Sequence, residues 1–281
     1  MSHRTRQTNG LFVLRAATDA YYWKPSTAWF RALELAEYER LQIRLEAPSL
    51  DLGCGDGRVA WMLERLGLLA PHPIGTDRAQ HQLRLATRLN VHEDLVRSDG
   101  AQLPFPDSVF RSVLCNGVIC SVPNGSRAVV EEVRRVLEPG GCATFTVPTD
   151  RFNAVLFWPR FLGTFSPRLR ARYERAMDAR NQHYWMRSPD EWRAELENAG
   201  FEIVSVQPFF RRDEGVLYNL LAMHVLRFAG VLRLVDGSLA HRTFGLIVAS
   251  LLRRPFQRGL KVRRDSGDEA GYVLLHVQRP E

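Results

Sequence analysis

Residues 50–57 read LDLGCGDG, an apolar run around one aspartate followed by glycines at positions 53, 55 and 57. Glycine lets a backbone turn tightly and approach a ligand without a clash from Cβ, and the free N–H groups at the start of a helix face the same ligand. The stretch therefore predicts a strand that turns into a helix around a bound molecule. It is not the dinucleotide fingerprint GxGxxG, because Arg58 stands where the third glycine belongs.

The residues after this turn alternate between short apolar runs and amphipathic stretches, which is typical of βαβ units and a parallel sheet. Strands are predicted over 48–52, 73–77, 94–98, 110–116 and 141–148, and helices over about 57–68, 78–90 and 126–137. Two later runs, FEIVSVQPF and GYVLLHVQR, are predicted to pair as an antiparallel hairpin with a long excursion at its tip.

The remaining segments give the expected organisation of the chain. The large apolar residues after the fifth strand predict a helical cap, and a later apolar and arginine-rich stretch predicts a second helical insertion. We expect an N-terminal helical segment at 1–47, a core at 48–149, a cap at 150–190, the closing part of the core at 191–210 and 268–281, and an insertion at 211–267.

The glycine turn resembles motif I of the class I S-adenosylmethionine-dependent methyltransferases, in particular the small-molecule enzymes of the ubiquinone-biosynthesis type. Three further elements resemble that family in the same order: PIGTDRA around Asp77, SDGAQLPFPDSVF with Asp99 as its second residue, and the fourth strand ending at Asn116. The resemblance implies an α/β fold with a Rossmann-like seven-stranded sheet, mostly parallel with one antiparallel strand and flanked by helices.

The same resemblance implies S-adenosylmethionine as cofactor, S-adenosylhomocysteine as product, and no metal. An acidic residue at the end of the second strand would hold the ribose hydroxyls, and an aspartate after the third would meet the adenine amino group. The N-terminal aromatic cluster at 21–23 is expected either to close over the methionine part or to pack in the core. The implied cofactor residues are Asp51, Gly53, Cys54, Gly55, Asp77, Arg78, Asp99, Gly100, Ala101, Asn116 and Tyr22.

Methyl transfer from a sulfonium requires mainly alignment of the reactants in a dry site, although an oxygen acceptor gains from a general base. His183 and Tyr184, in the cap sequence RNQHYWMRSP, are the catalytic candidates, with a structural role at a helix end as the alternative. No Asn-Pro-Pro-Tyr run or Pro-Cys pair follows the fourth strand. We therefore expect O-methylation of an apolar small molecule, lipid or glycolipid.

The formal net charge is +7, and arginine supplies nearly all of the positive charge. No basic stretch interleaved with aromatic residues precedes the C-terminal region, so a nucleic-acid partner is not expected. Residues 216–264 combine apolar runs with a basic cluster, which suits peripheral contact with an anionic membrane, a buried cap or a dimer surface. The oligomeric state stays open.

The first ten residues lack the apolar run of a secretory signal, and the four cysteines form no CxxC pair, so a cytoplasmic protein with reduced thiols, membrane-associated or not, is expected. Two other functions share these features. A nicotinamide-dependent dehydrogenase has a similar glycine turn, although its glycine spacing differs. A non-catalytic membrane-associated or complex-forming protein could also retain the fold, because fold does not fix function.

Overall fold

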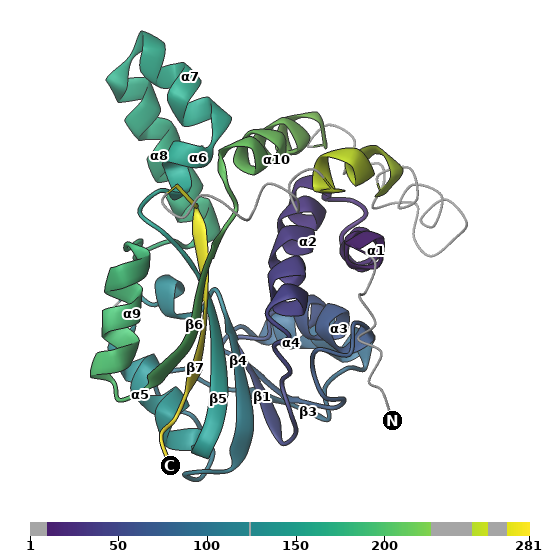
Figure 1. The fold of residues 1–281 in the computed structure, drawn as a ribbon, viewed down its shortest axis with the longest axis vertical. Coiled ribbons are helices and arrows are strands. Elements are labelled where there is room, and N and C mark those ends of the chain that lie inside the picture. Colours follow the sequence, from purple (N-terminus) through teal and green to yellow (C-terminus); the bar gives the residue numbers. More distant parts are fainter. Residues whose placement is uncertain (1–9, 124, 226–248, 258–268) are drawn as a thin grey trace.

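The computed structural model describes residues 10–123, 125–225, 249–257 and 269–281. A seven-stranded sheet lies at its centre with helices on both faces (Figure 1). The strands are β1 (Ser49–Leu52), β2 (Ile74–Asp77), β3 (Asp94–Arg97), β4 (Phe110–Asn116), β5 (Leu137–Pro148), β6 (Glu202–Phe209) and β7 (Tyr272–Gln278). The helices are α1 (Gly10–Ala20), α2 (Pro25–Arg40), α3 (Arg58–Arg65), α4 (Gln80–Ala86), α5 (Arg127–Val136), α6 (Phe152–Val155), α7 (Phe157–Phe165), α8 (Pro167–Asn181), α9 (Pro189–Asn198) and α10 (Arg212–Val225).

The strand order is β3-β2-β1-β4-β5-β7-β6. Strands β1 to β5 pair in parallel, whereas β7 runs antiparallel to both of its neighbours, β5 and β6. This confirms the predicted Rossmann-like sheet and the antiparallel pairing of the last two strands. Because β1 has β2 on one side and β4 on the other, the chain changes direction across the sheet there, and in open α/β sheets ligands bind beyond the carboxyl ends at such a point.

Two apolar cores hold the helices on the sheet. On one face, Val129, Val130 and Val133 of α5 and Trp192 and Leu196 of α9 pack against inward residues of β1, β4, β5 and β7. The other core joins α1, α2 and α3 to the cap, and Figure 1 shows these helices on the side of the sheet opposite α5 and α9. Burial on both faces explains the near-continuous apolar sequence of the central strands.

Most predicted elements are present with shifted ends. The N-terminal segment forms two helices and an extended stretch that carries an isolated bridge between Leu45 and Leu69. Strand β5 begins at Leu137 instead of 141, because Leu137 pairs with Phe110 before a register shift restores pairing at Cys142. The predicted helix at 78–90 is divided into α4 and a 3-10 turn over Thr87–Leu89.

The cap consists of α6, α7 and α8, which follow the carboxyl end of β5 at the top of the molecule in Figure 1. Of the second insertion, α10 and a helix at 249–257 are described, and most of the predicted membrane-contact region 216–264 lies outside the described residues. Among those described, no helix is long and apolar enough to cross a membrane. All four cysteines are free thiols.

Candidate active site

The glycine turn after β1 has the backbone that its sequence predicts. Gly53, Gly55 and Gly57 all have positive φ, at 67°, 55° and 77°. A Cβ at Gly53 would lie 2.4 Å from Cγ2 of Val118, whereas a Cβ at Gly55 would meet nothing within 4 Å. The turn is therefore packed against the loop after β4 on one side and open on the other. That open side is where a ligand can reach the backbone.

Two predicted carboxylates lie at the carboxyl ends of β2 and β3. Asp77 accepts from the backbone N–H groups of Gly55, at 3.0 Å, and Ala79, at 2.8 Å, so it fixes the turn from the neighbouring strand. The Asp99 side chain is exposed and accepts from the N–H of Ala101 at 2.9 Å. Each carboxylate oxygen can accept a second hydrogen bond, so both side chains can still bind hydroxyl or amino groups.

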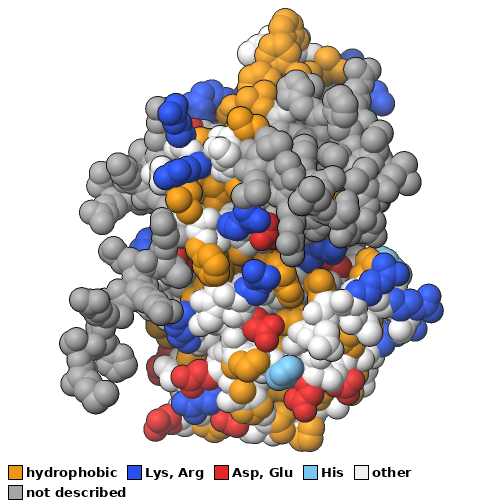
Figure 2. All heavy atoms as spheres, turned by 90° about the vertical axis from the view of Figure 1, so that its right-hand side faces the viewer, with side chains coloured by type: hydrophobic (Ala, Val, Ile, Leu, Met, Phe, Trp, Pro, Cys, Tyr) orange, Lys and Arg blue, Asp and Glu red, His pale blue; other side chains and the backbone are white. Residues whose placement is uncertain are grey.

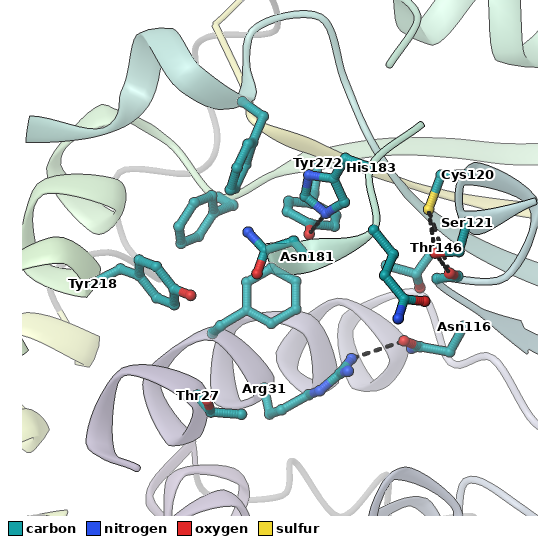
Figure 3. A pocket seen from close by; sticks show the side chains of 15 residues that line it. Thr27, Arg31, Asn116, Cys120, Ser121, Thr146, Asn181, His183, Tyr218 and Tyr272 are labelled. Atoms are coloured by element: carbon teal, nitrogen blue, oxygen red, sulfur yellow. Dashed lines mark hydrogen bonds between the residues drawn. The ribbon is translucent and has the colours of Figure 1, made fainter. Parts of the chain in front are cut away.

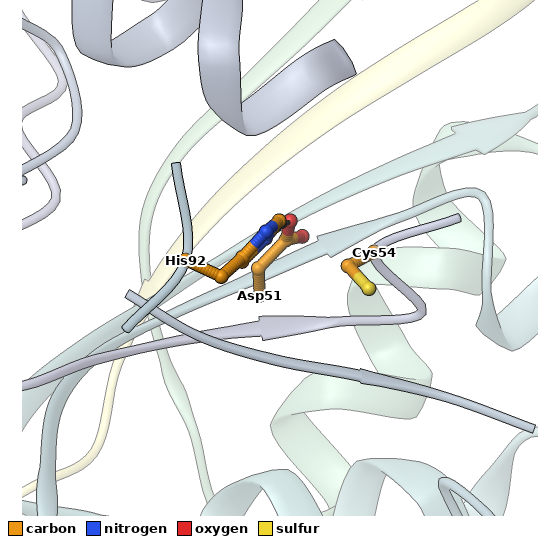
Figure 4. Close-up of side chains that lie close together, drawn as sticks. All are labelled: Asp51, Cys54 and His92. Atoms are coloured by element: carbon orange, nitrogen blue, oxygen red, sulfur yellow. Dashed lines mark hydrogen bonds and ion pairs between the residues drawn. The ribbon is translucent and has the colours of Figure 1, made fainter. Parts of the chain in front are cut away.

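Asp51 on β1 and Cys54 in the turn are both buried. The Asp51 carboxylate is buried and lies 2.9 Å from Nε2 of His92, a residue of the loop before β3 (Figure 4). A Cβ at Gly75 would come within 2.7 Å of the His92 ring, so glycine there lets the ring reach Asp51. Cys54 is buried beside them, and burial raises the pKa of its thiol well above the usual range. The contact between Asp51 and His92 joins β1 to the loop before β3, and a role of Asp51 and Cys54 in cofactor binding stays a prediction.

The N-terminal aromatic cluster is attached to the same turn. The Arg58 guanidinium lies 4.5 Å from the ring centre of Trp23, and its Nε donates to the carbonyl of Ala20 at 2.9 Å. Tyr22 is buried and meets Trp23 edge to face, with 5.0 Å between the ring centres. The segment between α1 and α2 thus covers the beginning of α3, next to the glycine turn. A direct contact of Tyr22 with a cofactor stays a prediction.

A cavity of about 340 Å³ lies between α2, the carboxyl ends of β4 and β5, the cap and α10 (Figure 3). Asn116 and Gly117, which line it, directly precede the Val118 that packs against Gly53. The cavity is thus adjacent to the glycine turn. Its aromatic lining comes from five separate parts of the chain: Phe30, Phe152, Phe210, Tyr218 and Tyr272.

A charged network forms the α2 side of this cavity. Nη1 of Arg31 donates to Oδ1 of Asn116 at 2.8 Å and to the buried Glu34 carboxylate, and the Asn116 amide donates back to Glu34. Figure 3 shows the Arg31 side chain extending from α2 toward Asn116. Both the oxygen and the nitrogen of the Asn116 side chain are therefore hydrogen-bonded within the protein.

His183 lies in the cavity wall, where Nε2 is 2.8 Å from the hydroxyl of Tyr272 on β7 (Figure 3). Burial lowers the pKa of His183 to about 4 and raises the pKa of Tyr272 well above its usual value, so both groups are uncharged at neutral pH. Tyr184 does not join them. Tyr184 is 54% exposed and is not among the residues that line the cavity.

Comparison with known proteins identifies the family. A family model described as a methyltransferase domain matches residues 26–206, more than half of the chain and all of the strands that form the glycine turn and its neighbours. The chain belongs to this methyltransferase family. The assignment argues against the dehydrogenase considered as an alternative.

Individual relatives of this methyltransferase match over shorter stretches. Methyltransferase GfsG of Streptomyces halstedii is 32% identical over 111 residues, which cover 37% of this chain and 38% of the relative. The 2-phytyl-1,4-naphtoquinone methyltransferase of Synechococcus elongatus is 34% identical over 102 residues, which cover 34% of this chain and 42% of the relative. The matches thus span about two fifths of the curated relatives' length. Phosphoethanolamine N-methyltransferase 2 of Haemonchus contortus, solved with S-adenosyl-L-methionine, shares the fold with a TM-score of 0.56 and 18% identity, covering 88% of this chain and 52% of that one.

S-adenosylmethionine is the methyl donor of methyltransferases with this fold, and the residues at the glycine turn suit this cofactor. The glycine turn leaves open space beside Gly55, as a cofactor that approaches the backbone requires. Asp77 and Asp99 supply acceptor oxygens at neighbouring strand ends, which suits ribose hydroxyls and an amino group. Residues 53–55, Asp77 and Asp99 would hold the cofactor, with support from the exposed Arg78 and from Gly100 and Ala101 in the turn after Asp99.

The sequence did not reveal Arg31, Glu34 or Tyr272 as parts of the methyltransferase site. Arg31 and its partner Glu34 come from a helix that precedes the core motifs, and Tyr272 comes from the last strand. Arg31 and Tyr272 therefore line the cavity only through tertiary contacts. One signal was present in the sequence. An arginine and a glutamate three residues apart lie on one helix face, although such pairs are usually exposed.

Proposed function

We propose that this methyltransferase transfers the methyl group of S-adenosylmethionine to a hydroxyl oxygen of a small organic acceptor that has a planar, apolar body. The observation that carries the proposal is the position of the cavity. Asn116 and Gly117 in its lining directly precede the Val118 that packs against Gly53, and the His183–Tyr272 pair lies in its wall. Its volume of about 340 Å³ is within the usual range for small-molecule sites.

The aromatic lining supports the acceptor class. Phe30 and Tyr272 lie 4.6 Å apart between ring centres, and Phe152 stacks on Phe210 at 6.3 Å. Such walls bind flat rings by offset stacking and edge-to-face contact. One relative is named for a naphthoquinone substrate, which agrees with a ring-bearing acceptor. The head of a ring-bearing lipid belongs to the same class.

When bound, S-adenosylmethionine supplies a methyl carbon on a positively charged sulfur that leaves as a neutral thioether. The protein aligns the acceptor oxygen with that carbon and excludes water, which is the main requirement of the reaction. The oxygen becomes strongly acidic as its bond to the methyl carbon forms. Its proton then passes to Oη of Tyr272, while the proton of Tyr272 passes to Nε2 of the neutral His183. A histidine with a low pKa is sufficient for this late transfer.

The test is a methyl-transfer assay with labelled S-adenosylmethionine and a panel of phenols, hydroxyquinones and matched anilines, for the wild type, Tyr272→Phe and His183→Gln. Labelled ethers are expected from hydroxylated rings, with kcat lowered about 100-fold in Tyr272→Phe and cofactor affinity unchanged, since a positioned base contributes about this much. Tyr218→Phe, which removes another hydroxyl from the same wall, serves as the matched control. Methylation of the anilines alone would contradict the choice of oxygen, and intact cofactor binding without any product would contradict methyl transfer to this acceptor class.

A further inference from the structure

The α7–α8 hairpin projects from the upper end of the molecule (Figure 1). It carries a row of aromatic side chains. Phe157, Phe161 and Phe165 are four residues apart on α7, with 5.6 Å and then 5.1 Å between successive ring centres. Phe161 is 43% exposed, Phe165 is 72% exposed, and Leu169 at the start of α8 is 48% exposed. These four residues are called the aromatic ridge.

The aromatic ridge is unlike the scattered apolar residues of an ordinary surface. Its phenylalanines contact one another in succession along α7, and Figure 2 shows hydrophobic side chains running to the uppermost point of the molecule. A contiguous exposed patch of this kind typically marks a surface that binds a partner or a membrane. A burial role within the chain does not explain Phe165, which is the most exposed of the four.

The charges around the ridge indicate which partner. Residues 157–181 contain six arginines against two acidic residues, and Arg170 is the arginine that pairs with Glu174, at 2.8 Å. Figure 2 shows positive side chains gathered beside the apolar tip. At the base of the hairpin a second cavity, of about 300 Å³, has four arginines in its lining: Arg151, Arg160, Arg170 and Arg212. Glu269 is the acidic residue in this lining.

We propose that the α7–α8 hairpin binds the surface of an anionic phospholipid membrane, with the aromatic ridge entering the boundary between headgroups and acyl chains and the arginines contacting lipid phosphates. Aromatic side chains favour that boundary, and juxtamembrane arginines are attracted to anionic lipids. Arginine donors also match phosphate oxygens geometrically. Pairing with a second copy of the chain would bring two arginine-rich hairpins together, so charge disfavours self-association through this face.

The α7–α8 hairpin is continuous in sequence with the lining of the cavity beside the glycine turn. Helix α8 ends at Asn181, and residues 181–183 line the cavity beside the glycine turn. A membrane held at the hairpin would therefore lie on the same side of the molecule as the cap that encloses the cavity. The membrane contact itself does not depend on which acceptor the cavity takes.

The test is co-sedimentation of the full chain with vesicles of phosphatidylcholine alone or of phosphatidylcholine mixed with phosphatidylglycerol, at low and high salt. The wild type is expected to bind the anionic vesicles, less so at high salt. Phe161→Ser with Phe165→Ser, and separately Arg168→Glu with Arg172→Glu, should each weaken binding at least about tenfold, since one arginine near an anionic surface contributes about fivefold.

The controls match each variant in kind. Phe12→Ser removes a phenylalanine that is also 43% exposed, on α1, and Arg84→Glu with Arg88→Glu reverses two exposed arginines at the same spacing on the other side of the glycine turn. Both should bind like the wild type, and circular dichroism should be unchanged in every variant. Equal binding by hairpin and control variants, or no binding by the wild type, would overturn the proposal. The proposal would also be overturned if free inorganic phosphate removed all binding, or if the wild type were a dimer and the serine variant a monomer.

Discussion

Gly53 must be glycine for two reasons: its backbone conformation disfavours a Cβ, and the neighbouring Val118 leaves no room for one. Its φ of 67° is unfavourable for any residue with a Cβ, and a Cβ would in addition lie 2.4 Å from Val118. Gly67 has nearly the same φ, 66°, but a Cβ there would meet nothing within 4 Å. An alanine at 67 would therefore have only the conformational strain, whereas an alanine at 53 would have the strain and a steric clash.

We predict that Gly67→Ala lowers the free energy of unfolding by about 1 kcal/mol, the usual cost of a left-handed alanine. Gly53→Ala should cost about 2 kcal/mol more, because Val118 and the loop after β4 must move. Urea denaturation measures both, and calorimetry should show weakened S-adenosylmethionine binding in Gly53→Ala alone. Equal effects of the two substitutions on stability and binding would show that the contact with Val118 is unimportant.

His183 makes stability depend on pH. Burial lowers its pKa to about 4 in the folded protein, below the value near 6.5 expected on unfolding, so the unfolded chain binds more protons between these values. The contribution to stability is complete above about pH 6.5 and is lost as the pH falls toward 4. Between pH 7 and pH 5 the loss is about 2 kcal/mol.

His183→Gln lacks this titration and can still bond Tyr272. The stability advantage of the wild type over the variant should therefore shrink by about 2 kcal/mol from pH 7 to pH 5, measured by urea unfolding at both values. His276, whose pKa burial also lowers, is present in both proteins and cancels. A difference that stays constant with pH would mean that His183 is not buried as the structure shows.

Among single residues, the sequence predicted those whose geometry is set by their neighbours along the chain. The turn glycines and the two strand-end carboxylates could be placed because a few consecutive residues determine their geometry. The contact of Asp51 with His92 was not predictable in this way, because the two residues are 41 positions apart in the sequence. Tyr184 was a candidate because it follows His183, although adjacent side chains point in different directions.

Helix α2 is the element that joins the N-terminal segment to the rest of the molecule. Trp29 is buried, its ring meets Phe256 edge to face at 5.9 Å, and its Nε1 donates to the carbonyl of Glu214 on α10 at 3.0 Å. The same helix carries Arg31 to the cavity. Docking of α2 on α10 therefore positions the charged network at the site.

Trp29→Phe should lower the free energy of unfolding by about 2 kcal/mol, because the ring is largely retained but the buried carbonyl of Glu214 loses a donor. Denaturant unfolding measures this cost. Phe12→Leu, a change on the exposed face of α1, should cost little. A Trp29→Phe variant as stable as the wild type would mean that packing alone holds α2 on α10.

Element types were predictable where a period repeats, as in the amphipathic α5 and the alternation of β6 and β7. Element ends were less so. Strand β5 begins four residues early because Phe110 on β4 offers a pairing partner to Leu137, and a partner on another strand leaves no mark in the local pattern. The division of the N-terminal segment into α1 and α2, by contrast, follows from a proline at the start of α2.

For the whole molecule, the order of motifs along the chain was sufficient to predict the sheet, because right-handed βαβ connections leave few topologies. The cavity was not predictable in the same way. Its walls come from α2, β4, β5, the cap, α10 and β7, and no sequence pattern specifies how such distant segments meet.

We propose that this methyltransferase binds S-adenosylmethionine at the glycine turn with Asp77. The most direct test is calorimetric titration of the full chain with S-adenosylmethionine and S-adenosylhomocysteine, using Asp77→Ala and, as a matched control, Asp94→Ala, which removes an exposed carboxylate at the opposite end of β3. We expect the wild type and Asp94→Ala to bind both ligands equally well. Binding to Asp77→Ala should be about 100-fold weaker, since two charge-assisted hydrogen bonds from the ribose hydroxyls to the carboxylate are lost. No binding by the wild type, or equal binding by a folded Asp77→Ala, would contradict it.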